Sequence, residues 1–145
     1  MTEDEKKVAY MQILQANINR MSTASAIIKG FAATIVAGIT SANIKETYLW
    51  MIGLLFLPML TFLALDVYYL MLEHRYRFMY DAVRTGLHVV DFSMKPVFVN
   101  YGVAHASRRL LKEIWICFRS PSIWLFYPLL ITIMIISSRI LQKSK

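Results

Sequence analysis

The sequence predicts a single-domain, all-α integral membrane protein with three transmembrane helices, a hairpin plus one, and cytoplasmic amphipathic helices. Hydrophobic residues make up 57% of the 145-residue chain and its mean hydropathy is +0.48, whereas soluble domains are about 45–50% apolar. Charged residues make up only 17% of the chain and fall in blocks between long apolar runs. The surplus of apolar side chains must face lipid or a partner, so the lipid bilayer is the first partner we expect.

Residues 1–23 predict an amphipathic helix that runs straight into the membrane. Its apolar positions recur at spacings of four, four and three, which is the period of one helix face. These positions are Tyr10, Leu14, Ile18 and Met21.

The first predicted span, residues 24–44, contains a charge. Lys29 leaves only fifteen uncharged residues, Gly30 to Ile44, before Lys45, and a bilayer core requires about 20. We therefore expect Lys29 to extend toward the interface or to face a polar group.

Small residues occupy every fourth position along this span, and such ladders let helix backbones approach closely in lipid. The ladder consists of Ser22, Ala26, Gly30, Thr34, Gly38 and Ala42. One interpretation is packing against the second helix of the same chain. The other is a subunit contact in a homo-oligomer, or a pore lining shared by several copies.

The second predicted span, residues 48–70, has aromatic residues at both ends, as is typical of membrane interfaces. Pro58 should kink it mildly. Asp66 is its only charged residue and lies within one turn of its cytoplasmic end. Because an acid at membrane depth is usually paired or hydrated, we expect Asp66 to reach the interface or to meet a base such as Lys29.

Residues 72–120 predict a cytoplasmic helical region. We expect the second helix to continue to Val90, Pro96 to break it, and a basic amphipathic helix to follow at Ala104 to Phe118. A third span is expected at residues 123–140, because Ser120 and Pro121 provide the cap and first-turn chemistry of a helix start.

The distribution of positive charge predicts the orientation. Eight basic residues lie between Glu73 and Ser120, against Lys45 alone at the tip of the hairpin. By the positive-inside rule, the middle region and the amino terminus are expected on the cytoplasmic side of a bacterial inner membrane. Three spans then put the carboxyl tail outside, and a re-entrant third helix is the alternative.

The cytoplasmic helices are expected to present a basic surface. Its residues are Arg84, Arg108, Arg109 and Lys112. Such a surface suits an acidic ligand, which leaves RNA, a nucleotide signal and anionic lipid as alternatives. Retention of positive charge on the cytoplasmic side explains most of the pattern without any ligand.

The sequence favours no catalytic function. His88 is four residues from Arg84 and would share its helix face, but no nucleophile, metal-ligand set or glycine-rich phosphate loop accompanies His74 and His88. Cys117 is the only cysteine, which excludes an internal disulfide and a cysteine-based metal cluster. We expect no enzyme activity, no metal and no cofactor.

The stretch from Leu65 to Arg84, followed by Asp91 to Pro96, resembles a group of small bacterial membrane proteins in which a membrane hairpin ends in a D-x-Y-Y-L-x-x-E-x-x-Y/F-R-x-x-Y run. More loosely, it resembles the SLATT-like membrane effectors of antiviral defence systems. The residues that match the run are Asp66, Tyr68, Tyr69, Glu73, Arg77 and Tyr80.

This resemblance covers about half of the chain and implies an oligomeric inner-membrane effector that perturbs or permeabilises the membrane when triggered. Because no sensor is evident in the sequence, the trigger is expected from a cytoplasmic sensor or other partner protein, or from a nucleotide signal. Two alternatives stay open: a bacteriocin-immunity or holin-like membrane protein, and a non-catalytic subunit of a membrane complex.

Overall fold

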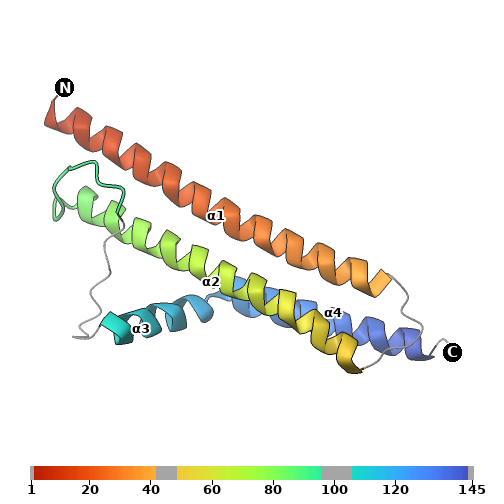
Figure 1. The fold of residues 1–145 in the computed structure, drawn as a ribbon. Helices are drawn as coiled ribbons and strands as arrows, with labels where there is room; N and C mark the ends of the chain where they lie inside the picture. The colour runs from red at the N-terminus through yellow and green to blue at the C-terminus, as the bar shows by residue number, and fades with distance from the viewer. Residues whose placement is uncertain (1, 42–48, 96–105, 144–145) are drawn as a thin grey trace.

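The computed structural model describes residues 2–41, 49–95 and 106–143, and all regular structure within them is helical. The helices are α1 (Glu3–Ser41), α2 (Leu49–Arg84), α3 (Ala106–Phe118) and α4 (Pro121–Lys143). α1 lies along α2 for most of its length, and α3 and α4 pack on α2 in turn, with α4 also touching α1 (Figure 1). The predicted all-α fold class is confirmed.

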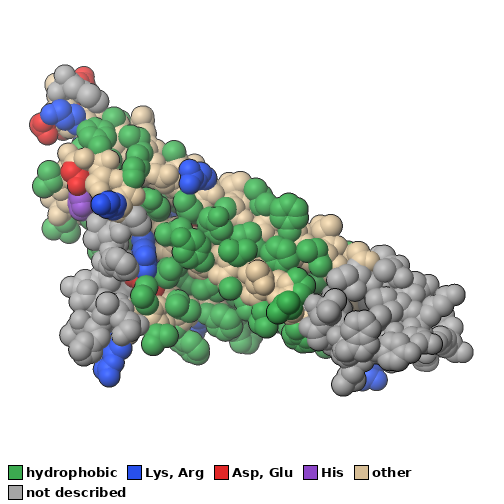
Figure 2. Space-filling view, viewed as in Figure 1, with side chains coloured by type: hydrophobic (Ala, Val, Ile, Leu, Met, Phe, Trp, Pro, Cys, Tyr) green, Lys and Arg blue, Asp and Glu red, His purple; other side chains and the backbone are tan. Residues whose placement is uncertain are grey.

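Two of the described helices are long and apolar enough to cross a membrane, α1 and α2. α3 and α4 together pass the same test as a pair bent by 59° at the break between them. α1 has 39 residues and α2 has 36, so each is more than 50 Å long at about 1.5 Å per residue. Both therefore exceed the roughly 30 Å of a bilayer core. Figure 2 shows hydrophobic side chains over the middle of one face, with charged side chains gathered toward the N-terminal end.

α1 begins at a reciprocal cap and continues without a break. The Glu5 backbone N–H donates to Thr2 Oγ1, and the Thr2 N–H donates to the Glu5 carboxylate, at 3.3 and 2.7 Å. This capping box satisfies donors that the first turn would otherwise leave unpaired. The amphipathic residues 3–23 and the apolar residues 24–41 form one helix, as expected.

The predicted apolar face of α1 is buried against α2. Tyr10, Leu14, Ile18 and Met21 form a cluster with residues of α2 that includes Met79 and is completed by Tyr76 and Val83. The buried stripe then continues along α1 through Ser25, Ile28, Ala32 and Val36. Its spacing averages about 3.7 residues, close to the period of a straight helix, so one face can follow α2 without marked supercoiling.

The second helix ends at Arg84, so the expectation that it continues to Val90 is wrong. Gly86 has a φ of +77°, and the Leu87 N–H donates to the Ala82 carbonyl at 2.9 Å. A glycine in this left-handed conformation terminates helices because it carries no Cβ to clash. His88 therefore does not share a helix face with Arg84. Pro96, the expected breaker, lies outside the described residues.

Residues 87–95 fold back over the open end of the α1–α2 hairpin. The Tyr10 hydroxyl donates to the Ser93 carbonyl at 2.8 Å, and the Tyr76 hydroxyl donates to the Met94 carbonyl at 3.0 Å. Burial, reinforced by the neighbouring Asp91 carboxylate, raises the pKa of Tyr10 to about 12. Tyr10 is therefore protonated at neutral pH and remains a donor to the returning segment.

α3 and α4 meet at a two-residue elbow. α3 ends at Phe118 and α4 begins at Pro121, with the Trp124 N–H donating to the Ser120 carbonyl at 3.0 Å. Proline is favoured at the first helical position because it has no N–H to leave unpaired there. The first two residues expected in α3, 104 and 105, lie outside the described residues.

Candidate functional site

The ladder of small residues faces away from the other helices that the structure describes. Its described members are all exposed: Ser22, Ala26, Gly30, Thr34 and Gly38. We call these five residues the small-residue face; Ala42 lies outside the described residues. Beyond its own turns of helix, a Cβ built on Gly30 or Gly38 would meet no atom of the described residues within 4 Å. Packing against the second helix of the same chain is therefore the wrong interpretation for these five residues.

The reason is the position of the larger side chains of α1. Met21, Ile28 and Val36 contribute more apolar area than the small residues, and they form the stripe that is buried. The small-residue face is displaced around the helix from this stripe, and Ile27 and Phe31 beside it are both more than half exposed. An apolar surface with closely accessible backbone is thus left for lipid or another helix.

A buried ion pair joins α1 to α2. Lys29 Nζ lies 2.7 Å from Asp66 Oδ2 and donates a hydrogen bond to Oδ1 at 2.8 Å. The Ser25 hydroxyl also donates to Asp66 Oδ1 and accepts from Lys29 Nζ at 2.7 Å. The Asp66 side chain is 0% exposed and that of Lys29 is 14% exposed. The expected meeting of Lys29 and Asp66 is therefore present, with a serine as third member.

The complete cluster is more favourable than a cluster that has lost one of its two charged partners. Burying an unpaired charge costs several kcal/mol, about 3–5 when one partner of a buried pair is removed. Tyr127 of α4 adds a further polar group, since its buried hydroxyl interacts electrostatically with the Asp66 carboxylate. The cluster consequently selects one rotational setting of α1 on α2 and brings α4 against the same point.

A second buried ion pair joins α2 to α3. The Arg75 Nε–H donates to Glu113 Oε2 at 2.9 Å, and Nη2 approaches the same oxygen. Both residues are buried. Asp66 and Arg75 are nine residues apart on α2, which is about two and a half turns, so they lie on opposite sides of that helix. α2 thus binds α1 through the carboxylate of Asp66 and binds α3 through the guanidinium of Arg75.

The residues of α2 that match the D-x-Y-Y-L-x-x-E-x-x-Y/F-R-x-x-Y run have two kinds of surroundings: some are packed in the interior and others lie at the surface. Tyr69 and Tyr80 are partly buried against the cluster formed with α1. Glu73 and Arg77 form an ion pair at 2.7 Å, and Tyr68 is half exposed and lines an apolar groove with Ile114 and Phe118 of α3. The run therefore contributes to the packing of α2 on α1 and to the surface of α2 that faces α3.

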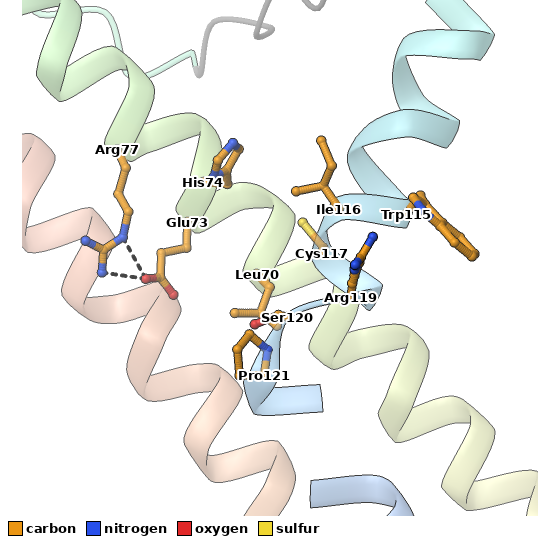
Figure 3. A pocket seen from close by; sticks show the side chains of 10 residues that line it. All are labelled: Leu70, Glu73, His74, Arg77, Trp115, Ile116, Cys117, Arg119, Ser120 and Pro121. Carbon is orange, nitrogen blue, oxygen red and sulfur yellow. Dashed lines mark hydrogen bonds and ion pairs between the residues drawn. The ribbon is translucent and has the colours of Figure 1, made fainter. Parts of the chain in front are cut away.

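A second, polar groove lies between α2 and the α3–α4 elbow (Figure 3). It has a volume of about 550 Å³. Its polar and charged side chains are Glu73, His74 and Arg77 of α2 together with Arg119 and Ser120 of the elbow. Its apolar lining is Leu70, Trp115, Ile116, Cys117 and Pro121.

The four basic residues expected to form one surface come from two different helices. Arg84 pairs with Asp81 at 3.4 Å at the end of α2, whereas Arg108 and Lys112 belong to α3, and nothing is described for the Arg109 side chain. Within residues 2–41, 49–95 and 106–143, no three His, Cys, Asp or Glu side chains are placed to hold a metal ion.

Ser25, Arg75, Glu113 and Tyr127 are the polar residues that the sequence-based interpretation missed. Glu113 did carry a signal, because it is the only acid after Asp91 and follows Leu110 by three residues on the apolar side of its helix. The sequence distinguishes Arg75 in no way from the other basic residues between Glu73 and Ser120. Ser25 and Tyr127 gave no comparable signal, since serine and tyrosine are common at such positions in membrane helices.

No protein-family model, curated protein or solved structure matches this chain.

Proposed function

We propose that this chain is an effector of bacterial antiviral defence that self-associates in the inner membrane through the small-residue face and perturbs or permeabilises the membrane when triggered. The antiviral role draws on the resemblance of the α2 run to defence-associated membrane proteins. The self-association draws on the geometry of α1. A separate sensor protein, or a nucleotide or RNA signal at the basic α3, acts as the trigger.

The observation that carries the proposal is the exposure of the small-residue face. In lipid there is little hydrophobic drive between helices, so association depends on close backbone approach at small residues. Gly30 and Gly38 offer such an approach because nothing else in the described chain occupies it. The face runs from Ser22 to Gly38, about 24 Å at 1.5 Å per residue, which is most of a bilayer core.

The proposed topology has three spans with a cytoplasmic amino terminus. α1 and α2 each exceed the bilayer thickness, and the acidic start of α1 and the polar end of α2 lie at the same end of the hairpin (Figure 1). The basic residues between Glu73 and Ser120 favour the cytoplasmic side for this end. In this topology α4, which meets α3 at a bend of 59°, supplies the third span, and the carboxyl tail then lies outside.

The test is the copy number of the detergent-purified protein, measured by light scattering corrected for bound detergent. We expect the wild type to form a closed assembly of several copies. The double variant Gly30→Leu/Gly38→Leu should shift to the monomer, with unchanged helical circular dichroism because both positions are open. Leu57→Phe, which adds bulk at an exposed position of α2, is the matched control and should keep the wild-type mass.

Membrane perturbation is tested with the same three proteins in vesicles loaded with a fluorescent dye. Wild type and Leu57→Phe should release dye, and the double glycine variant should release much less. A monomeric wild type, or a glycine variant that assembles and releases dye like the wild type, would refute the proposed role of the face.

A further inference from the structure

We propose that the polar groove between α2 and the α3–α4 elbow binds the phosphate of an anionic phospholipid, of the phosphatidylglycerol type. This inference rests on the membrane location proposed above but not on self-association. The groove holds about 550 Å³, within the roughly 300–1,000 Å³ of small-molecule sites. It is therefore large enough for a headgroup and the adjoining glycerol.

The position of the groove fits the membrane interface. Leu70 is the last residue of the expected second span, and Pro121 is the first residue of α4, so the groove lies where two apolar helices leave or enter the bilayer. Trp115 lines it and is 66% exposed. Tryptophan prefers the headgroup level of a membrane because its ring is apolar and its N–H is polar.

The charges of the groove favour an anion. Arg119 has no hydrogen-bond or ion-pair partner for its guanidinium within the described part of the chain, and it is exposed at the groove. Glu73, the only carboxylate among the described residues of the lining, accepts two hydrogen bonds from Arg77 at 2.7 and 2.9 Å (Figure 3). That pair is neutral as a unit, which leaves Arg119 as the uncompensated charge and the exposed His74 imidazole as a further polar group.

Guanidinium groups suit phosphate because two N–H groups can bind two phosphate oxygens in parallel. The apolar lining residues Leu70 and Ile116 would then contact the glycerol and the first carbons of the acyl chains. A free phosphate would use the guanidinium but gain nothing from this apolar lining. An exposed arginine without an ion-pair partner in the described chain, next to apolar side chains at the membrane interface, therefore favours the phosphate of a lipid over free phosphate.

The experiment is native mass spectrometry of the full-length protein released from mild detergent, with phosphatidylglycerol or phosphatidylcholine added at equal concentrations. The wild type should retain phosphatidylglycerol preferentially. Arg119→Gln should lower this retention about tenfold, the loss expected for one charge-assisted hydrogen-bonding group. Arg84→Gln, which removes another exposed arginine that lies outside the groove lining, is the control and should retain lipid like the wild type.

A competition arm with inorganic phosphate identifies the source of the ligand. We expect millimolar phosphate not to displace the lipid. Displacement by phosphate, equal retention of the two lipids, or unchanged retention by Arg119→Gln would each overturn the proposal. In the mass spectrum, bound lipid and the number of protein copies give different mass increments. A groove that does not bind lipid can therefore be distinguished from a protein that does not self-associate.

Discussion

The pair between Lys29 and Asp66 provides the sharpest test of the structure. Lys29→Met or Asp66→Leu leaves one charge buried without its counter-ion, and each single variant should lose about 3–5 kcal/mol of stability. The double variant removes both charges, and the Ser25 hydroxyl can then bond to a carbonyl of its own helix. We therefore expect the double variant to recover most of the loss, with a coupling free energy of at least about 2 kcal/mol between the two positions.

The assay is thermal unfolding of the detergent-purified proteins, followed by circular dichroism. For a chain of this size 1 kcal/mol corresponds to about 2–4 °C, so each single variant should unfold on the order of 10 °C earlier. The same cycle at the exposed pair of Asp81 and Arg84, whose side chains are 62% and 64% exposed, is the control, and its coupling should stay below about 1 kcal/mol. Additive effects of Lys29→Met and Asp66→Leu, or an unchanged midpoint for Asp66→Leu, would refute the reasoning.

Three further predictions follow from the other contacts. Glu113→Leu removes the carboxylate that holds the buried Arg75, so trypsin should cleave after Arg108 faster than in the wild type, whereas the double variant Arg75→Met/Glu113→Leu should restore resistance. The pKa of Tyr10 is raised to about 12, so its contribution to stability is complete below pH 10 and is lost as the pH rises through about 12. The difference in unfolding midpoint between wild type and Tyr10→Phe should therefore narrow over that pH range. A difference that stays constant would contradict the raised pKa. Gly86→Ala should cost about 1–2 kcal/mol, because its φ of +77° is strained for any residue with a Cβ; an unchanged midpoint would show that the turn relaxes.

Much of the helical architecture was predictable because periodicity is a local property. The spacing of Tyr10, Leu14, Ile18 and Met21 alone identified the face of α1 that is buried. The Ser120-Pro121 start of α4 was equally visible, since caps act within one turn. The end of α2 differs from the prediction because apolar residues keep a helical spacing through Leu87 and Val90, whereas the helix ends at Arg84, just before the recognisable stop signal Gly86.

The candidate sites were only partly predictable. Lys29 and Asp66 stood out because a charge in an apolar run requires a partner. The pairing of Arg75 with Glu113 joins residues 38 positions apart, and its formation depends on how α3 turns back onto α2. The polar groove likewise combines side chains from α2 and from the elbow, which are adjacent only after the chain folds.

The sequence by itself determined that this chain forms long apolar helices, and it marked the positions on them that repeat with a helical period. Only the tertiary structure decided what each face contacts: the larger residues of α1 pack on α2, and the small-residue face is left outward. The physical reason is that periodicity defines faces without defining their partners. The choice between two faces of one helix depends on the area that each buries and on where the buried charges can pair.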